Sequence, residues 1–280
     1  MPCPAPTAPA NVLSIAGTDP TGGAGIQADL KTFGALGAYG MAVVTAVVAQ
    51  NTQAVRVVSP LAPELVQAQL EAVFEDVTVA AVKIGMVANA GIAEAIAEVL
   101  ARHRPPFVVF DPVMAASTHK RLMNESDLER IRTALLPQVS LLTPNLKEAA
   151  RLLDIAQPVD EAGMRACLPA LQALGVPNVL LKGGHLAEDA PESTDLLATP
   201  EGVIRLSAPR IATRHGHGTG CTLSSAIAAL WPRHGLEKAT RMAKDYVHGA
   251  LLHADALQVG HGRGPLHHFW QAVHLPGQLA

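Results

Sequence analysis

A succession of short, almost purely apolar runs constrains the fold of this chain most strongly. The runs predicted to be strands cover residues 12–16, 41–49, 80–86, 107–110, 141–145 and 179–185. Helical periodicity follows most of these runs, and strands that are apolar throughout are typical of a parallel sheet with both faces covered. We therefore predict an α/β fold with a central, mostly parallel β-sheet and helices on both faces.

The rest of the chain is predicted to complete one domain around this sheet. The other expected elements are helices over residues 61–74, 90–101 and 236–257, an edge hairpin over residues 194–208, and a helix from Thr219 that stops before Trp231-Pro232. Proline recurs through residues 1–10, which predicts a disordered tail. A single domain is expected over residues 11–275.

Composition excludes several classes of function. A net charge of −3 without a basic run argues against nucleic-acid binding. No apolar run reaches the ~20 residues that span a bilayer, and the N-terminus lacks the pattern of a signal peptide. Cys3, Cys167 and Cys221 are too few and scattered for a disulfide framework, so we expect a cytoplasmic protein. The twelve histidines match no metal-binding spacing.

Polar residues gather just after the predicted strands, where ligands of open α/β sheets bind. The first of these loops, the glycine-rich residues 17–25, lies between a strand and a helix, as in a ligand-binding βα unit. Asp19 in the loop and Asp29 in the helix could accept hydrogen bonds from a polar ligand. A capping Asp19 and a solvated Asp29 explain the two residues equally well.

A second glycine-rich turn, over residues 215–221, leads into the apolar helix that begins at Thr219. Free N–H groups and the dipole of a helix N-terminus favour an anion, so Gly218 and Gly220 are candidates for holding a phosphoryl group. Cys221 in the first turn would then be biased towards the thiolate. The alternatives are a turn that only permits tight packing and a cysteine that is a small buried hydrophobe.

Other requirements of phosphoryl transfer also have candidates at strand ends. Asn145 and Glu148 share one helix face and offer the oxygen ligands that Mg²⁺ takes, although Glu148 also fits a capping box. Asp111 is either a second metal carboxylate or an Asx-turn residue. Lys182 could meet nucleotide phosphates, and Cys221 could be the base for an acceptor hydroxyl.

Seven motifs occur in a fixed order along the chain, over residues 18–33, 48–52, 83–86, 111–114, 142–149, 182–185 and 217–224. In this order they resemble the hydroxymethylpyrimidine/phosphomethylpyrimidine kinases of thiamine biosynthesis, a ribokinase-like family. The similarity runs from about residue 11 to residues 265–268, nearly the whole chain. The resemblance implies a ribokinase-like fold and ATP-dependent phosphorylation of 4-amino-5-hydroxymethyl-2-methylpyrimidine, then of its monophosphate.

The resemblance also implies roles for the matching residues. The aminopyrimidine would be surrounded by Gly17, Ala24, Asp29, Gln50, Met86 and Val113. Mg²⁺ and ATP would be met by Asn145, Glu148, Lys182 and Thr219. The anion hole would consist of Gly218, Gly220 and Cys221, with Cys221 as the general base or as the residue that positions the hydroxyl. A homodimer is also implied.

One segment departs from the family pattern. After Asp-Pro-Val-Met the family usually continues with Ala-Lys-Ser-Gly-Asp, whereas this chain has Ala-Ser-Thr-His-Lys over residues 116–120. If this loop covers the phosphates, Lys120 could replace the missing lysine from a shifted position. Otherwise phosphate affinity or the second phosphorylation could be impaired.

Three other functions compete with this interpretation. A pyridoxal or pyridoxine kinase acts on a similar hydroxymethyl heteroaromatic, although Gln50 and a slot between Met86 and Val113 favour a pyrimidine. Cys221 with His217 could form a nucleophile–base pair for acyl transfer. The altered loop would also suit a pyrimidine-binding protein without catalysis.

Overall fold

The computed structural model describes residues 8–114, 125–184, 186 and 190–271. Most of the predicted tail, including Cys3, lies outside these residues, as do His185 and the atypical segment 116–120. Strand β1 (Asn11–Ala16) begins where the domain is predicted to start. Within the described chain, no helix combines the length and the hydrophobicity needed to cross a membrane.

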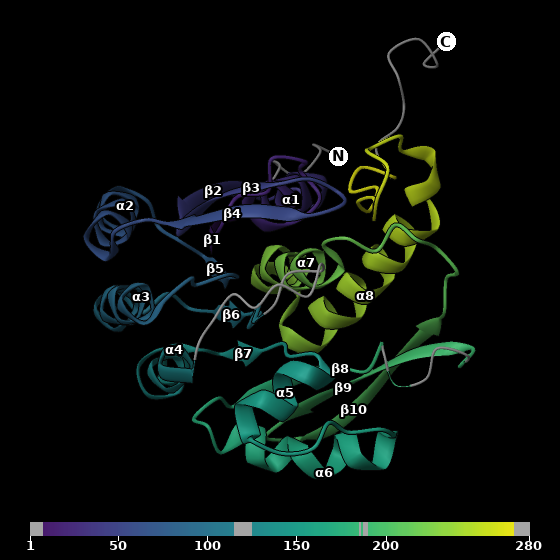
Figure 1. The fold of residues 1–280 in the computed structure, drawn as a ribbon. Coiled ribbons are helices and arrows are strands. Elements are labelled where there is room, and N and C mark those ends of the chain that lie inside the picture. The colour runs from purple at the N-terminus through teal and green to yellow at the C-terminus, as the bar shows by residue number, and fades with distance from the viewer. Residues whose placement is uncertain (1–7, 115–124, 185, 187–189, 272–280) are drawn as a thin grey trace, which may run out of the picture.

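One mixed sheet of eight strands forms the centre of the described fold (Figure 1). With β1 it contains β2 (Tyr39–Val44), β5 (Ala81–Ile84), β6 (Val108–Phe110), β7 (Leu141–Leu142), β8 (Asn178–Lys182), β9 (Glu192–Thr199) and β10 (Gly202–Pro209). Their order is β10-β9-β8-β7-β6-β5-β1-β2. The strands from β8 to β2 are parallel, and the hairpin β9–β10 adds two antiparallel strands at one edge. The predicted mostly parallel sheet and edge hairpin are confirmed.

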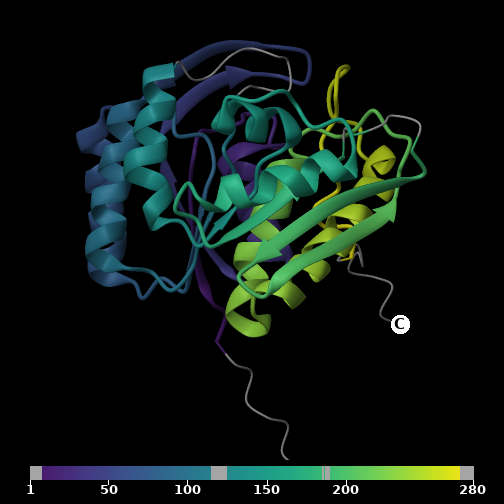
Figure 2. The same cartoon turned by 90° about the horizontal axis from the view of Figure 1, so that it is seen from below.

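Helices cover both faces of this sheet (Figures 1 and 2). On one face lie α1 (Gly25–Ala35), α7 (Thr219–His234) and α8 (Leu236–Leu252). On the other lie α2 (Pro63–Asp76), α3 (Ala90–His103), α4 (Glu125–Arg130), α5 (Leu146–Leu153) and α6 (Glu161–Gln172). The chain moves from β1 to β2 on one side and from β5 to β8 on the other. Crossovers on opposite faces open a crevice at the carboxyl ends of β1 and β5.

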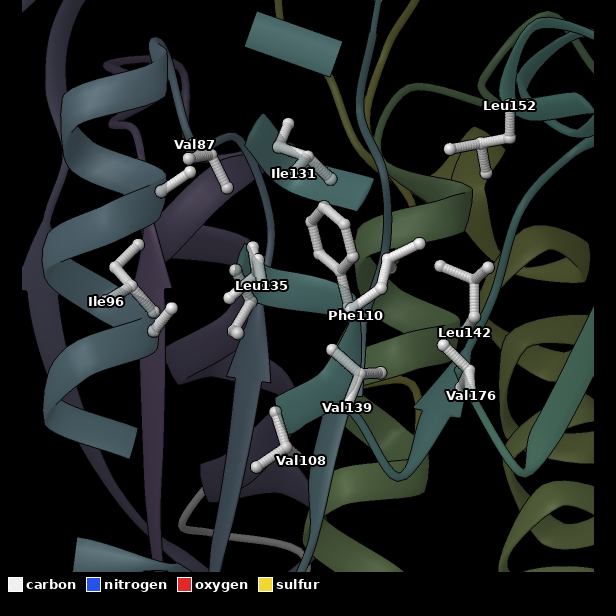
Figure 3. Close-up of a cluster of buried hydrophobic side chains, with 14 of the residues drawn as sticks. Val87, Ile96, Val108, Phe110, Ile131, Leu135, Val139, Leu142, Leu152 and Val176 are labelled. Atoms are coloured by element: carbon white, nitrogen blue, oxygen red, sulfur yellow. The ribbon is translucent and has the colours of Figure 1, made fainter. Parts of the chain in front are cut away.

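Alternation along the strands divides the core between the two faces. Val108 and Phe110 of β6 belong to the cluster beneath α3, with Ile131 and Leu135 around the Phe110 ring (Figure 3). Val109, between them, belongs to the cluster beneath α7 and α8. Each fully buried side chain of this kind contributes roughly 1.5–3 kcal/mol of transfer free energy. The sheet therefore holds the loops at its carboxyl ends in fixed positions.

The single strand predicted over residues 41–49 is wrong, because the chain leaves the central sheet at Thr45. Thr45 is fully buried, and its hydroxyl donates to the Met86 carbonyl at 2.6 Å. The chain continues as β3 (Ala46–Gln50), which pairs with β4 (Val55–Pro60) in a separate antiparallel sheet. We call this two-stranded sheet the flap.

The glycine-turn helix is longer than predicted. α7 continues through Pro232 to His234, and Gly235 ends it with a positive φ of 72°. A proline in the last turn removes one intrahelical hydrogen bond, and the Trp231 ring stacks on Phe107 with ring centroids 4.6 Å apart. The other long helix predicted, over residues 236–257, divides into α8 and a 3₁₀ turn over Ala254–Ala256.

Candidate active site

A cavity of about 430 Å³ opens at the carboxyl ends of the parallel strands, with the flap on one side and the N-terminus of α7 on the other. Its wall contains every residue predicted for the site except Asp29, namely Gly17, Ala24, Gln50, Met86, Asp111, Val113, Asn145, Glu148, Lys182, Gly218, Thr219, Gly220 and Cys221. These residues come from five strand ends, the flap and the N-terminus of α7, so the fold brings together positions as far apart as Gly17 and Cys221.

The two glycine-rich loops pack backbone against backbone. Gly218 has φ +85°, and a Cβ atom there would lie 1.8 Å from the carbonyl oxygen of Gly23. Only glycine allows both this conformation and this approach. The Asp19 carboxylate ties the loops together further, because its Oδ2 lies 2.8 Å from Nε2 of His217. The anion-hole turn is therefore fixed against the first loop.

Asp19 serves this loop structure. It is buried, and its carboxylate accepts hydrogen bonds from the amides of Thr21, Gly23 and Ala24. Burial alone would raise the pKa of Asp19, but hydrogen bonds, the strongest from His217, lower it overall. The helix-capping role considered for Asp19 is wrong, because Ala24 is the N-cap of α1 and no side chain caps that helix. Asp19 holds the loop that precedes the helix.

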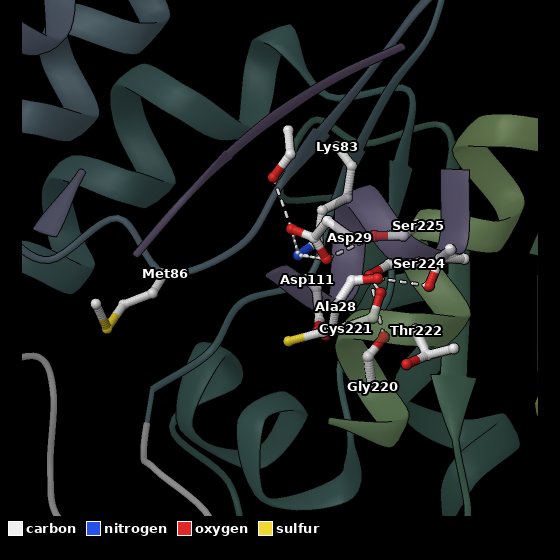
Figure 4. Close-up of polar contacts among 12 residues, drawn as sticks. Ala28, Asp29, Lys83, Met86, Asp111, Gly220, Cys221, Thr222, Ser224 and Ser225 are labelled. Carbon is white, nitrogen blue, oxygen red and sulfur yellow. Dashed lines mark hydrogen bonds and ion pairs between the residues drawn. The ribbon is translucent and has the colours of Figure 1, made fainter. Parts of the chain in front are cut away.

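Asp29 lies behind the cavity wall. Its carboxylate is fully buried and accepts hydrogen bonds from the hydroxyls of Ser14 and Ser225 and from the Lys83 ammonium, the last at 2.8 Å to each oxygen (Figure 4). The solvated helix residue considered from sequence is therefore wrong. The expected ligand contact also lacks a free surface, since Lys83, and not Asp29, lines the cavity.

Asp111 and Lys182 form an ion pair directly against the glycine turn. Lys182 Nζ lies 2.6 Å from Asp111 Oδ1. A Cβ atom on Gly220 would lie 3.1 Å from this nitrogen and 3.2 Å from Asp111 Oδ2. Burial lowers the pKa of Lys182, but the carboxylates of Asp111 and Glu148 raise it overall. A permanent cation therefore lies beside the turn.

Asn145 and Glu148 form the capping box that was one of the two interpretations. The Asn145 side chain accepts from the Glu148 amide at 3.0 Å, and Glu148 Oε2 accepts from the Asn145 amide at 2.8 Å. Burial raises the pKa of Glu148 to about 7, the nearby Asp111 adds to this, and Lys182 opposes it.

Within the described residues, no group of three or more His, Cys, Asp and Glu side chains is arranged to hold a metal ion.

Cys221 differs from the sequence prediction in its ionisation. Burial raises the pKa of its thiol to about 11; Lys83 opposes this shift, whereas Asp29 and Asp111 add to it. The expected bias towards the thiolate is wrong, because these effects outweigh the helix N-terminus. His217 contacts Asp19 through Nε2, which weighs against a nucleophile–base pair with Cys221.

Apolar side chains also line the cavity. Met86 and Val113 lie in its wall with Gln50 of the flap. A Cβ atom on Gly17 would lie 2.3 Å from the Met86 methyl carbon, so the absence of a side chain there leaves room for Met86. Gln50 also forms a hydrogen bond with Asp19 that helps to lower the pKa of that carboxyl.

Several wall residues were missed from sequence. The flap contributes Val48, Val55 and Val58, and the segment after α8 contributes Arg263. Alternation of apolar residues around positions 55–58 is a signal that could have identified the second flap strand. Nothing in the sequence near Arg263 indicates that this segment packs against the connection between the two flap strands.

A second cavity of about 300 Å³ lies on the other side of the glycine turn, between the hairpin β9–β10 and α8. The two cavities share Asn145, Lys182, Gly216, Thr219, Gly220 and Arg263. A glycine turn between two cavities, with a cation and carboxylates beside it, suits transfer of a phosphoryl group from one ligand to another.

The fold and site together define a ribokinase-like kinase. The structure of the pyridoxal kinase from Staphylococcus aureus in complex with ADP matches with a TM-score of 0.87 and 30% identity, covering 96% of each chain. Within this class, the family model described as phosphomethylpyrimidine kinase matches residues 19–267, and the chain belongs to that family.

Curated relatives agree with this assignment. The hydroxymethylpyrimidine/phosphomethylpyrimidine kinase of Salmonella typhimurium is 55% identical over 260 residues, which cover 92% of this chain and 97% of that protein. A bifunctional thiamine biosynthesis protein of Geobacter sulfurreducens is 44% identical over 269 residues, covering 96% of this chain and 54% of its own length. The resemblance and the ribokinase-like fold predicted from sequence are confirmed.

Proposed function

We propose that this protein phosphorylates 4-amino-5-hydroxymethyl-2-methylpyrimidine with ATP, and then phosphorylates the monophosphate to the diphosphate, in thiamine biosynthesis. The observation that carries this proposal is the pair of cavities that meet at Gly220, beside Lys182 and Asp111. The names of the relatives at 55% and 44% identity support the choice of substrate and pathway.

The larger cavity holds the acceptor. The aminopyrimidine ring lies between Met86 and Val113, and the Gln50 amide hydrogen-bonds its polar edge. Gly17 and Ala24 leave room for the ring where a larger side chain would fill the cavity. Asp29 does not contact the ligand; its carboxylate fixes the position of the Lys83 ammonium, which lines the cavity.

The smaller cavity holds ATP, whose phosphates reach the glycine turn past Asn145, Lys182 and Thr219. The hydroxyl oxygen of the acceptor attacks the γ-phosphorus, the bond to the ADP oxygen breaks, and one proton is released. The amides of Gly218, Gly220 and Cys221 and the Lys182 ammonium stabilise the charge on the transferred group. Such transfers depend mostly on positioning and charge.

Cys221 positions the acceptor hydroxyl in this scheme. With a pKa of about 11, on the order of one thiol in ten thousand is ionised at pH 7. A neutral thiol orients a hydroxyl by hydrogen bonding, and phosphoryl transfer through a loose transition state needs little help from a strong base.

Mg²⁺ fits the donors present beside the glycine turn. Asp111 and Glu148 offer carboxylate oxygens and Asn145 an amide oxygen, the hard ligands that Mg²⁺ takes directly or through water. When bound there, the ion neutralises phosphate charge. Burial, with a contribution from Asp111, raises the pKa of Glu148 to about 7, and a cation at this site would favour its ionised form.

We also propose that the enzyme works in the cytoplasm as a homodimer. Three apolar side chains on β2 and the flap are more than half exposed, at Tyr39, Val47 and Val57. Such residues suit an interface between two copies. Light scattering should give twice the 29.2 kDa mass of the chain, and a monomer mass at assay concentration would contradict the dimer.

Substrate choice is tested by measuring ADP release with each acceptor in turn. We expect higher kcat/KM with the hydroxymethylpyrimidine than with pyridoxal, the alternative that the structural neighbour favours. Faster turnover of pyridoxal would reverse the assignment. Binding of the pyrimidine without ADP release would instead identify a non-catalytic binding protein.

A further inference from the structure

Arg263 lies in a segment that is fixed against the connection between the two flap strands. Its amide donates to the Thr52 carbonyl at 3.0 Å. Cβ atoms on Gly260 and Gly262 would lie 2.3 Å from Thr52 Oγ1 and 2.1 Å from the Thr52 carbonyl oxygen. The backbone on both sides of Arg263 is therefore packed tightly, and the start of its side chain is well placed.

The side chain of Arg263 lies in the walls of both cavities. A Cβ atom on Gly216, in the turn that leads to the anion hole, would lie 3.6 Å from an Nη atom of Arg263. The Arg263 guanidinium therefore reaches the boundary between the two cavities.

In the described part of the chain, Arg263 and Lys182 are the two cationic residues that line both cavities, and they differ in whether their charge is paired with a carboxylate. Lys182 is bound to Asp111, and deeper in the acceptor cavity Lys83 is bound to Asp29. The guanidinium of Arg263 has no hydrogen bond or ion pair with any residue that the structure describes. Its five N–H donors are available to a ligand. A planar guanidinium can donate two parallel hydrogen bonds to two oxygens of one phosphate group.

We propose that Arg263 binds a phosphate group at the junction of the two cavities. This inference rests on the proposed function, because that function supplies two phosphate-bearing ligands: the nucleotide and the monophosphate acceptor. Both bring negative charge close to Asp111 and Glu148, and Arg263 offsets this repulsion. The residue therefore contributes to affinity for a phosphorylated ligand and leaves the unphosphorylated alcohol unaffected.

The test compares Arg263→Met, Arg263→Lys and a matched control, Arg214→Met, an exposed arginine that lines neither cavity. Calorimetry measures the Kd of ADP with Mg²⁺ and of the pyrimidine monophosphate. Steady-state assays measure KM for ATP, for the alcohol and for the monophosphate. Thermal melting confirms that the variants fold.

In Arg263→Met, we expect the Kd of one phosphate-bearing ligand to rise about ten-fold or more, as for loss of a charged hydrogen bond. Arg263→Lys should recover part of the loss, and Arg214→Met should match the wild type. A rise for ADP, with a higher KM for ATP whichever acceptor is used, identifies the nucleotide as the source. A rise confined to the monophosphate identifies the acceptor phosphate.

Unchanged affinity for both ligands in Arg263→Met would overturn the inference. So would an equal rise in KM for the alcohol at saturating ATP, because that pattern indicates a structural effect. The binding measurements need no turnover. They therefore test Arg263 even if the wild-type enzyme phosphorylates neither acceptor, a result that would defeat the proposed function separately.

Discussion

Cys221 shows how burial can outweigh a helix terminus at a single residue. Because burial raises the pKa of this thiol to about 11, and only the thiolate reacts, alkylation should be slow at neutral pH. We expect the rate at Cys221 in the unliganded protein to rise about ten-fold per pH unit from pH 7 to pH 10. Mass spectrometry of the Cys221 peptide follows this rate. A rate that levels off near pH 8 would show an ordinary or lowered pKa.

Asp29 and Lys83 form an ion pair from which water is excluded, so removing one partner leaves a buried charge. Asp29→Asn should lower the free energy of unfolding by about 3–5 kcal/mol. The double variant Asp29→Asn with Lys83→Met should regain much of this stability, because it removes the unpaired ammonium. Urea denaturation measures both. A cost below about 1 kcal/mol for the single change would show that the pair is more hydrated than its geometry indicates.

Glu148 is expected to lower the stability of the fold when its carboxyl group is ionised. Its pKa in the fold is about 7 against 4.5 for an unperturbed group, so the folded state binds the additional proton. Stability is therefore lost as the pH rises from about 4.5 to 7. At pH 8, the free energy of unfolding of Glu148→Gln should exceed that of the wild type by up to about 3 kcal/mol. This difference should vanish below pH 5. Equal stability at both pH values would contradict the raised pKa.

The candidate residues could be named from sequence, but their electrostatics could not. Spacing and strand ends indicated Asp111, Glu148 and Lys182, because polar residues after apolar strands share one edge of a sheet. The pKa of Cys221 depends on Asp29, Asp111 and Lys83, which the sheet brings together from distant positions. Local sequence indicates the helix terminus only. That is why the thiolate prediction failed.

At the scale of elements, the two glycine loops work as one unit, and Gly218 is where they meet. An alanine at position 218 would have to adopt an unfavourable positive φ, and its Cβ would displace the Gly23 carbonyl. Because this moves the anion-hole turn, Gly218→Ala should lower kcat at least a hundred-fold. Gly175→Ala is the matched control, because Gly175 has φ +94° and nothing within 4 Å. It should cost about 1 kcal/mol of stability and leave kcat unchanged. Similar kcat in the two variants would show that loop contact is not required for catalysis.

Strands and helices were predictable where their pattern is local. The runs at β1, β5, β6 and β8 are mostly apolar, and the fold places each in the central sheet. The flap was missed because a continuous valine-rich run from β2 to β3 hides the break at Thr45. That break depends on a hydrogen bond from Thr45 to Met86, forty-one residues away. The flap lines the larger cavity, so this error concerned the site directly.

At the scale of the whole molecule, the sheet order decides where chemistry takes place. The strand order reverses between the parallel neighbours β1 and β5, and this opens the crevice. The α7 turn lies between the larger and the smaller cavity, which we propose hold the acceptor and the nucleotide. Each cavity alone would suit a binding protein. The shared boundary at Gly220, lined by Asp111 and Lys182, is what makes direct transfer between two ligands feasible.

Two successive phosphorylations of the pyrimidine can be followed by analysing the reaction products. The protein is incubated with 4-amino-5-hydroxymethyl-2-methylpyrimidine, ATP and Mg²⁺, and the products are followed by phosphorus NMR and mass spectrometry. We expect the monophosphate to appear first and the diphosphate second, with one ADP released at each step. Absence of any phosphorylated pyrimidine, under conditions where the protein binds both ligands, would contradict this expectation.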